Sequence, residues 1–152
     1  MPRILQEAAL LLLLAATGAV GSYFWHPAAP PLYAVQEPPR EDEVTVEQIR
    51  ERWRDDVLWL DARPRDQYDK AHVPGALPLN EQEFDELLLG LLDRLQTNTK
   101  PVVIYCGGAR CEASRKVRER LLEVVSIDQC RILKGGWPAW TAARGPGSAQ
   151  AK

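Results

Sequence analysis

Cys106 is the residue of this sequence that is best placed to act as a nucleophile. It follows an apolar run at residues 102–105, which is typical of a buried strand, and it precedes two glycines and a helix predicted from about residue 111 to 123. In α/β proteins ligands bind where strands end, and glycines let backbone amides converge on one point. The start of the following helix adds unpaired amides and partial positive charge. A thiol in such a loop loses its proton easily, so the sequence predicts an anion-binding loop around a reactive thiolate.

The residues predicted to bind the substrate anion follow the nucleophile directly. They are Gly107, Gly108, Ala109, Arg110 and Cys111, and Arg115 adds positive charge from the predicted helix. A cysteine at a strand end is often only a small buried apolar residue, so the loop by itself leaves a structural role open. Cys130, within a predicted strand, is interpreted as such a residue.

The elements predicted around this loop alternate between strands and helices. Strands are predicted at residues 57–60, 76–79, 102–105 and 127–133. Helices are predicted from a cap at Thr45 through Trp53, from a capping box of Asn80 and Glu83 through Leu95, from residue 111 to 123, and after Gly135 and Gly136, where the helix carries Trp137 and Trp140. This alternation predicts an α/β fold with a mostly parallel sheet and helices on both of its faces.

The chain is predicted to have four parts. Residues 1–25 are largely apolar and are interpreted as an uncleaved membrane anchor at residues 4–25, as a cleaved signal peptide, or as a plain apolar helix. The prolines of residues 26–43 predict a semi-rigid linker that ends in solvated, disordered acidic residues. Residues 44–144 form the domain, and residues 145–152 are predicted to be a disordered tail. Positive charge before the apolar segment, and none soon after it, predicts export with the domain on the non-cytoplasmic side.

Composition argues against two classes of function. The formal net charge of -2, without a block of lysine and arginine, gives no reason to expect nucleic acid as a partner. The three cysteines form no Cys-x-x-Cys pair and only two histidines could supplement them, so no metal site is predicted. No other cofactor is expected.

Three blocks of the sequence resemble the rhodanese-like domain family. The first comprises residues 58–64, 66–68 and 72–76, the second is the loop at Cys106, and the third is the motif at residues 133–140. They occur in family order and at family spacing, and together they cover nearly all of residues 57–141. The resemblance implies a rhodanese-like fold and a sulfurtransferase of the single-domain type.

The resemblance also implies roles for individual residues. Cys106 would attack the outer sulfur of a small donor such as thiosulfate or a persulfide, form a persulfide, and pass the sulfur to a thiophilic acceptor, which a protein could supply. The loop amides would hold the charged intermediate. Asp61 and Arg63, which follow a predicted strand, would support neighbouring loops.

The loop departs from the family pattern at its end. Many relatives have arginine five positions after the nucleophile, but here Cys111 occupies that position and the arginine lies one place earlier. Cys111 is either a resolving thiol that closes a disulfide with Cys106 or an incidental small residue, and both interpretations stay open. The disulfide would suit an alternative function, a non-catalytic or redox-sensing module that binds a partner protein. A protein phosphatase is not expected, because Glu112 stands where such enzymes need an arginine to bind phosphate.

Overall fold

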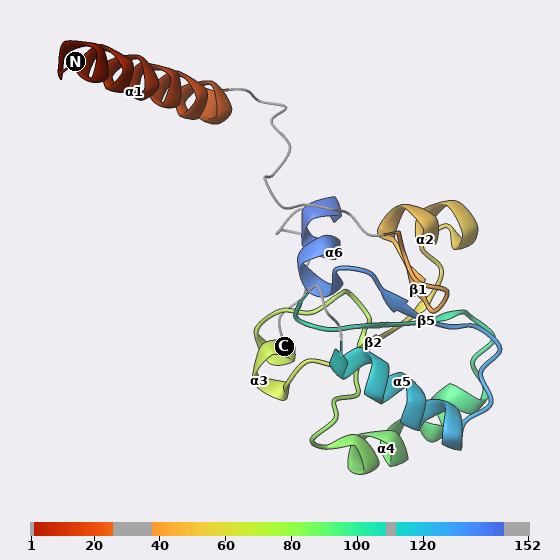
Figure 1. Cartoon of the computed structure of the whole chain (residues 1–152). Helices are drawn as coiled ribbons and strands as arrows, with labels where there is room; N and C mark the ends of the chain where they lie inside the picture. The colour runs from red at the N-terminus through yellow and green to blue at the C-terminus, as the bar shows by residue number, and fades with distance from the viewer. Residues whose placement is uncertain (1, 26–37, 109–111, 145–152) are drawn as a thin grey trace. The chain divides into compact units, whose positions relative to one another are not determined.

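The computed structural model describes residues 2–25, 38–108 and 112–144, which divide into two units, Met1–Glu37 and Pro38–Lys152 (Figure 1). The first unit contains one helix, α1 (Pro2–Trp25), whose leucines at positions 10–14 are all exposed. Within the described parts of the chain, no helix combines the length and apolarity needed to cross a membrane, so the predicted anchor at residues 4–25 is not supported. Most of the predicted linker and the whole predicted tail lie outside the described residues.

The second unit is built on a sheet that has five strands among the described residues. The strands are β1 (Glu43–Val44), β2 (Leu58–Asp61), β3 (Leu77–Pro78), β4 (Val102–Tyr105) and β5 (Cys130–Leu133). Their order is β1-β5-β4-β2-β3 and every pairing is parallel, so β4 lies at the centre and all carboxyl ends meet at one edge. Every residue of β2 and β4 is buried, as expected for strands that are covered on both faces.

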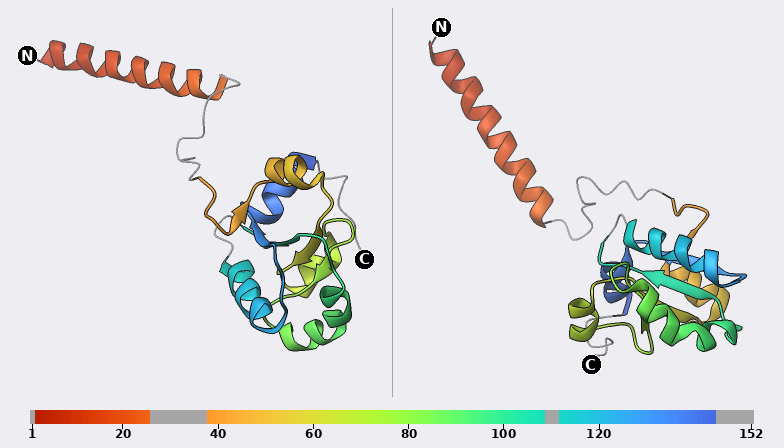
Figure 2. Two further views of the ribbon diagram at one scale, coloured as in Figure 1. Left: turned by 90° about the vertical axis from the view of Figure 1, so that its right-hand side faces the viewer. Right: turned by 90° about the horizontal axis from the view of Figure 1, so that it is seen from below.

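Helices cover both faces of this sheet, as the sequence predicts (Figures 1 and 2). On one face lie α2 (Val46–Trp53) and α6 (Gly136–Arg144), and on the other lie α4 (Phe84–Gln96) and α5 (Glu112–Val124). Side chains of β4 alternate between the faces: Val102 and Ile104 pack with α4 and α5, whereas Val103 and Tyr105 pack with α2 and α6. The predicted α/β class is therefore confirmed.

The two predicted helix starts differ in outcome. Thr45 caps α2 through a complete capping box with Gln48, and the helix ends at Trp53 as predicted. For the predicted box of Asn80 and Glu83, the Glu83 amide donates to the Asn80 side chain at 2.8 Å, but the Glu83 carboxylate accepts from the Asn80 side-chain amide, at 3.0 Å, and not from its backbone N–H. The start predicted at Asn80 is wrong, because these bonds form a turn and α4 begins only at Phe84.

Two parts of the domain were not predicted. Asp42 and Glu43 were expected to be solvated and disordered, but Glu43 opens β1, which pairs with β5, and both carboxylates bond to Arg115. The short helix α3 (Arg65–Lys70) follows β2 within the first block of the family resemblance. It has too few apolar residues to show a helical period.

Candidate active site

Cys106 directly follows the central strand, at the carboxyl edge of the sheet. Its side chain is buried, with 5% of the residue exposed, and it packs against Ile132 of β5. The sulfur is in the disulfide-bonded form, whereas Cys130 is a free thiol. The expected strand-loop-helix arrangement around the nucleophile is thus present in the described residues on either side of residues 109–111.

Gly108 presents its carbonyl oxygen to the sulfur. The distance from Sγ of Cys106 to this oxygen is 3.2 Å. A disulfide sulfur has no hydrogen to donate, but the reduced thiol can donate to this oxygen. Ala109, Arg110 and Cys111 lie outside the described residues, so the predicted convergence of their amides on the sulfur remains a prediction.

The loop lies between α6 and the segment that follows β2. On one side, the backbone amide of Trp137 donates a 2.7 Å hydrogen bond to the carbonyl oxygen of Cys106. On the other, a Cβ atom added to Gly107 would lie 3.4 Å from Oε1 of Gln67 and 3.9 Å from the Arg63 side chain. Neither Gln67 nor the amide of Trp137 was singled out from the sequence, although both lie within the motifs that carry the family resemblance.

A network of buried, hydrogen-bonded side chains lies next to the loop, with Arg63 close to Gly107. The Arg63 guanidinium forms two parallel contacts with the Asp61 carboxylate, of 3.0 Å from Nε and 2.6 Å from Nη2, and Nη2 also donates to the Ala71 carbonyl oxygen. Asp61 is 0% exposed and Arg63 is 5% exposed. The Tyr105 hydroxyl donates to Oδ2 of Asp61 at 2.6 Å and accepts from the amide of Val73. These bonds connect the ends of β2 and β4 to the segment before β3.

The network fixes the protonation state of its members. Burial acts to lower the pKa of Arg63, but its hydrogen bonds to Asp61 and the charge of that carboxylate outweigh burial and raise the pKa. Burial and the same carboxylate raise the pKa of the Tyr105 hydroxyl well above its ordinary value. Arg63 is therefore a permanent cation and Tyr105 a permanent hydrogen-bond donor across the physiological range.

Two tryptophan rings of α6 also pack at this network. The Arg63 guanidinium lies 4.3 Å from the centre of the Trp137 ring, and Trp137 stacks on Trp140 with ring centres 5.4 Å apart. Contact between a cation and aromatic faces adds stability when the group is desolvated. Arg63 therefore links Asp61 of β2 to Trp137 of α6, and the supporting role of Asp61 and Arg63 stays a prediction.

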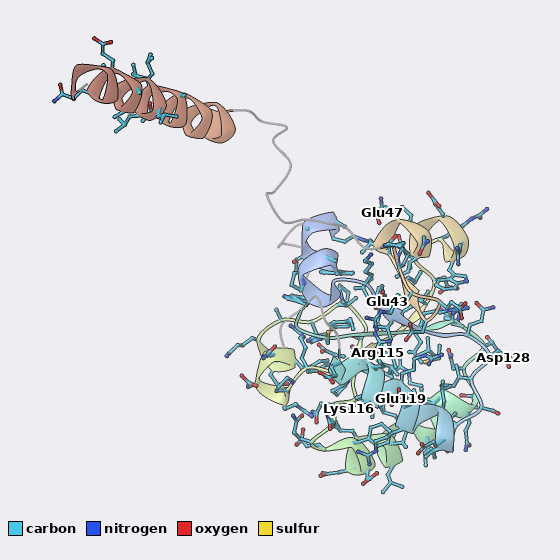
Figure 3. The ribbon with its side chains drawn as sticks, in the orientation of Figure 1. Glu43, Glu47, Arg115, Lys116, Glu119 and Asp128 are labelled. Atoms are coloured by element: carbon cyan, nitrogen blue, oxygen red, sulfur yellow. The ribbon has the colours of Figure 1, made fainter. Side chains whose placement is uncertain are left out.

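Arg115 does not contribute a free positive charge to the loop. Its guanidinium contacts the Asp42 carboxylate at 2.9 Å and the Glu43 carboxylate at 3.3 Å, so that α5 is joined to β1 (Figure 3). Two carboxylates offset its charge. The sequence suggested Arg115 because it lies close to Cys106 along the chain, but the helix turns its side chain toward the edge of the sheet.

Two hollows lie at the opposite edge of the sheet. One, of about 300 Å³, is lined by residues 98–101 and 126–129, and the other, of about 390 Å³, includes Trp59, Pro74 and residues 97–100. Both lie before the amino ends of strands and contain no cysteine. Among the described residues no cluster of His, Cys, Asp and Glu side chains could hold a metal ion.

A family model for the rhodanese-like domain matches residues 45–143 of the chain. The chain belongs to the rhodanese-like domain family. The match begins at the cap of α2 and ends within α6, so it covers the sheet from β2 to β5, the Cys106 loop and the Gly-Gly-Trp motif that contacts it.

Among curated proteins, the rhodanese-like domain is 33% identical over 93 residues to the HTH-type transcriptional regulator Rv0324 of Mycobacterium tuberculosis. The alignment covers 58% of this chain and 39% of that regulator, so the chain matches only a minor part of it.

Solved structures show the same fold. A rhodanese-like domain protein from Staphylococcus aureus aligns with a TM-score of 0.54 at 20% identity, over 73% of this chain and 98% of that one. A thiosulfate sulfurtransferase from Pseudomonas aeruginosa aligns with a TM-score of 0.56 at 26% identity, over 82% of this chain but only 21% of that one. Almost the whole Staphylococcus protein therefore aligns with the domain of this chain.

Proposed function

We propose that this rhodanese-like domain is a sulfurtransferase that carries sulfur as a persulfide on Cys106. The observation that supports it most directly is the position of the thiol. Cys106 follows the central strand at the carboxyl edge of a parallel sheet, and α5 begins six residues later. That edge is where ligands bind in α/β folds.

The proposed reaction has two steps. The Cys106 thiolate attacks the outer sulfur of thiosulfate; the sulfur–sulfur bond breaks, and sulfite leaves with the electron pair. A nucleophilic acceptor such as cyanide then attacks the outer sulfur of the persulfide, which returns the thiolate. The Gly107 amide and the amides of residues 109–111 are proposed to stabilise the negative charge, and the Asp61–Arg63–Tyr105 network to keep the strand end rigid.

The disulfide-bonded form of Cys106 sets a condition on this activity, because a sulfur in a disulfide cannot attack a donor. Cys130 is free, so Cys111 is the remaining cysteine of the chain and is the partner that we propose. A reducing dithiol would have to open the bond before transfer. An oxidising compartment, such as the predicted location outside the cytoplasm, would keep it closed.

The same disulfide favours a second candidate function, a redox-sensing module that binds a partner protein. Such a module would cycle between the disulfide and two thiols without carrying sulfur. The two functions differ in what the reduced protein does with a sulfur donor, and the fold is compatible with both.

Intact-mass spectrometry after reduction, removal of the reductant and addition of thiosulfate separates them. A sulfurtransferase gains about 32 Da, and Cys106→Ser, the control, does not. A redox module gains no sulfur and instead loses about 2 Da on mild oxidation, a loss that Cys111→Ser abolishes. Because Cys111 could displace the persulfide sulfur and close the disulfide, the decisive sample is reduced Cys111→Ser, and absence of the persulfide there would refute the transferase.

A further inference from the structure

Gly136, the first residue of α6, packs against the backbone of the nucleophile's loop. Its φ is +55°, and a Cβ atom built on it would lie 2.4 Å from the carbonyl oxygen of Cys106 and 3.2 Å from that of Gly108. Both neighbours are backbone atoms, which cannot rotate away as the end of a flexible side chain can. The close approach of the two segments therefore requires glycine at this position.

The Gly108 carbonyl connects this contact to the sulfur. The same oxygen lies 3.2 Å from Sγ of Cys106, so it is close both to Gly136 and to the sulfur. A side chain at position 136 must push this oxygen toward the sulfur or move the whole loop.

The first turn of α6 adds a directed bond. Amides at a helix start lack an acceptor within the helix, and the amide of Trp137 donates instead to the carbonyl of Cys106, over 2.7 Å. The C=O and the next N–H of a trans peptide point in opposite directions. This bond therefore also turns the Gly107 amide away from α6.

We propose that Gly136 is a positioning residue for Cys106, which lets the start of α6 hold the loop backbone so that the Gly108 carbonyl oxygen comes no closer to the sulfur than its present 3.2 Å. The proposal rests on the proposed role of Cys106 as a nucleophile and concerns the reactivity of its thiolate. A carbonyl oxygen carries partial negative charge, so moving one toward the sulfur destabilises the thiolate. A methyl group at position 136 should therefore make Cys106 harder to ionise.

The test is the pH dependence of Cys106 alkylation by iodoacetamide in the reduced full-length chain, for the wild type and Gly136→Ala. Trypsin places each cysteine on its own peptide, because cleavage after the arginines at positions 94, 110, 115, 120 and 131 yields fragments 95–110, 111–115 and 121–131. Lys100 precedes proline and is not cleaved. Gly136→Ala should raise the midpoint of Cys106 labelling by about one pH unit, which slows labelling at neutral pH about tenfold.

Gly75→Ala is the matched control. Gly75 has a similar left-handed φ of +77°, but a Cβ atom there would meet nothing within 4 Å. It carries the same backbone strain without touching the loop, so its labelling profile should match the wild type. An unchanged profile in folded Gly136→Ala, or an equal shift in Gly75→Ala, overturns the proposal.

A further measurement applies if the variant does not fold. If Gly136→Ala does not fold, amide hydrogen exchange of the reduced wild type decides: the Trp137 amide should be protected, and exchange as fast as in an unbonded amide overturns the proposal. Alkylation needs no sulfur donor. A protein that transfers no sulfur would therefore still report the effect of Gly136, so the two proposals can fail separately.

Discussion

Cys130 lies on β5 and Cys106 directly follows the neighbouring parallel strand β4. The two are equally buried, each with 5% of its surface exposed, but they occupy opposite ends of the sheet. Cys130 opens β5 and pairs in register with Val102, the first residue of β4. Cys106 follows the last residue of β4. Burial alone therefore does not distinguish the proposed nucleophile from a packing residue, whereas their positions at opposite ends of the sheet do.

The surroundings of the two cysteines explain the difference. At the carboxyl end, Cys106 is flanked by a glycine loop, the start of α6 and the buried Asp61–Arg63 pair. At the amino end, burial raises the pKa of Cys130 to about 11, and the nearby Arg118 lowers it only in part while donating to the Cys130 carbonyl oxygen. Cys130 therefore stays a neutral thiol at physiological pH.

The largest expected effect is on sulfur transfer. Cys106→Ser should reduce the rate of sulfur transfer from thiosulfate to cyanide by roughly a thousandfold or more, because the oxygen cannot form a persulfide. Cys130→Val, which removes the equally buried thiol, should retain the wild-type rate. Steady-state assay of both reduced variants makes the comparison. Comparable losses in the two would mean that the strand end does not determine which cysteine reacts.

The next largest effect concerns the ionic support of the carboxyl end. Asp61→Asn removes the carboxylate that neutralises the buried Arg63 and should lower the free energy of unfolding by about 3–5 kcal/mol. Asp69→Asn is the matched control, because the Arg65–Asp69 pair has the same charges but each side chain is 40% exposed, and its loss should cost about 0–1 kcal/mol.

Urea denaturation of both variants measures the difference. An equally small loss in Asp61→Asn would show that the carboxyl end does not depend on the buried pair.

The fold was largely predictable because its strands are buried on both faces. Residues 102–105 form an uninterrupted apolar run and become β4 with the predicted limits. β5 is shorter than its predicted range of 127–133, because Ile127 packs against the core from the preceding loop rather than within a ladder. β1 was missed because two residues cannot show a period, and its pairing with β5 is a contact between distant parts of the chain.

The candidate site was predictable at its nucleophile but not in its supports. Cys106 could be found because an apolar run, two glycines and a helix follow one another in the sequence. The bond from the Trp137 amide to Cys106 joins residues 31 apart, and the carbonyl of Gly108 faces the sulfur only because of the turn that the loop takes. Arg115 was placed near the loop by its position along the chain, whereas its partners come from β1.

A third prediction uses pH to examine the amino end. The ordinary pKa of a cysteine thiol is 9.0, and in the folded domain that of Cys130 is about 11. Below about pH 9 the thiol is protonated in both the folded and unfolded states, so it adds no pH dependence. Between about pH 9 and 11 only the unfolded chain ionises, so the free energy of unfolding should fall by about 3 kcal/mol before it levels off.

Cys130→Val isolates this contribution, because it keeps an apolar side chain and removes the titrating group. The difference in unfolding free energy between wild type and variant, followed from pH 8 to 11 by urea denaturation, should change in the variant's favour. Parallel pH profiles would show that Cys130 ionises as readily in the fold as in the unfolded chain. Burial would then not hold Cys130 in its neutral form, and the amino end of the sheet would not differ from the carboxyl end in this respect.

The smallest expected effect concerns a polar group near the carboxyl end. Ser114, in the first turn of α5, is 0% exposed, and its hydroxyl has no hydrogen-bond partner among the described residues. A buried hydroxyl without a partner costs about 1–3 kcal/mol, so Ser114→Ala should raise the free energy of unfolding by about 1 kcal/mol. Thr45→Ala is the opposite control, because it removes a bonded helix cap and should lower stability by about 1 kcal/mol.

Paired urea denaturation curves give the signs of both changes, and iodoacetamide labelling of Cys106 in the same samples adds a chemical reading. Stabilisation without a change in labelling would mean that burying the Ser114 hydroxyl lowers stability but does not affect the reactivity of Cys106. Destabilisation would contradict the prediction. Stabilisation with slower labelling would indicate that the hydroxyl also affects the reactivity of Cys106, because a role in the site is one explanation for a buried polar group without a partner.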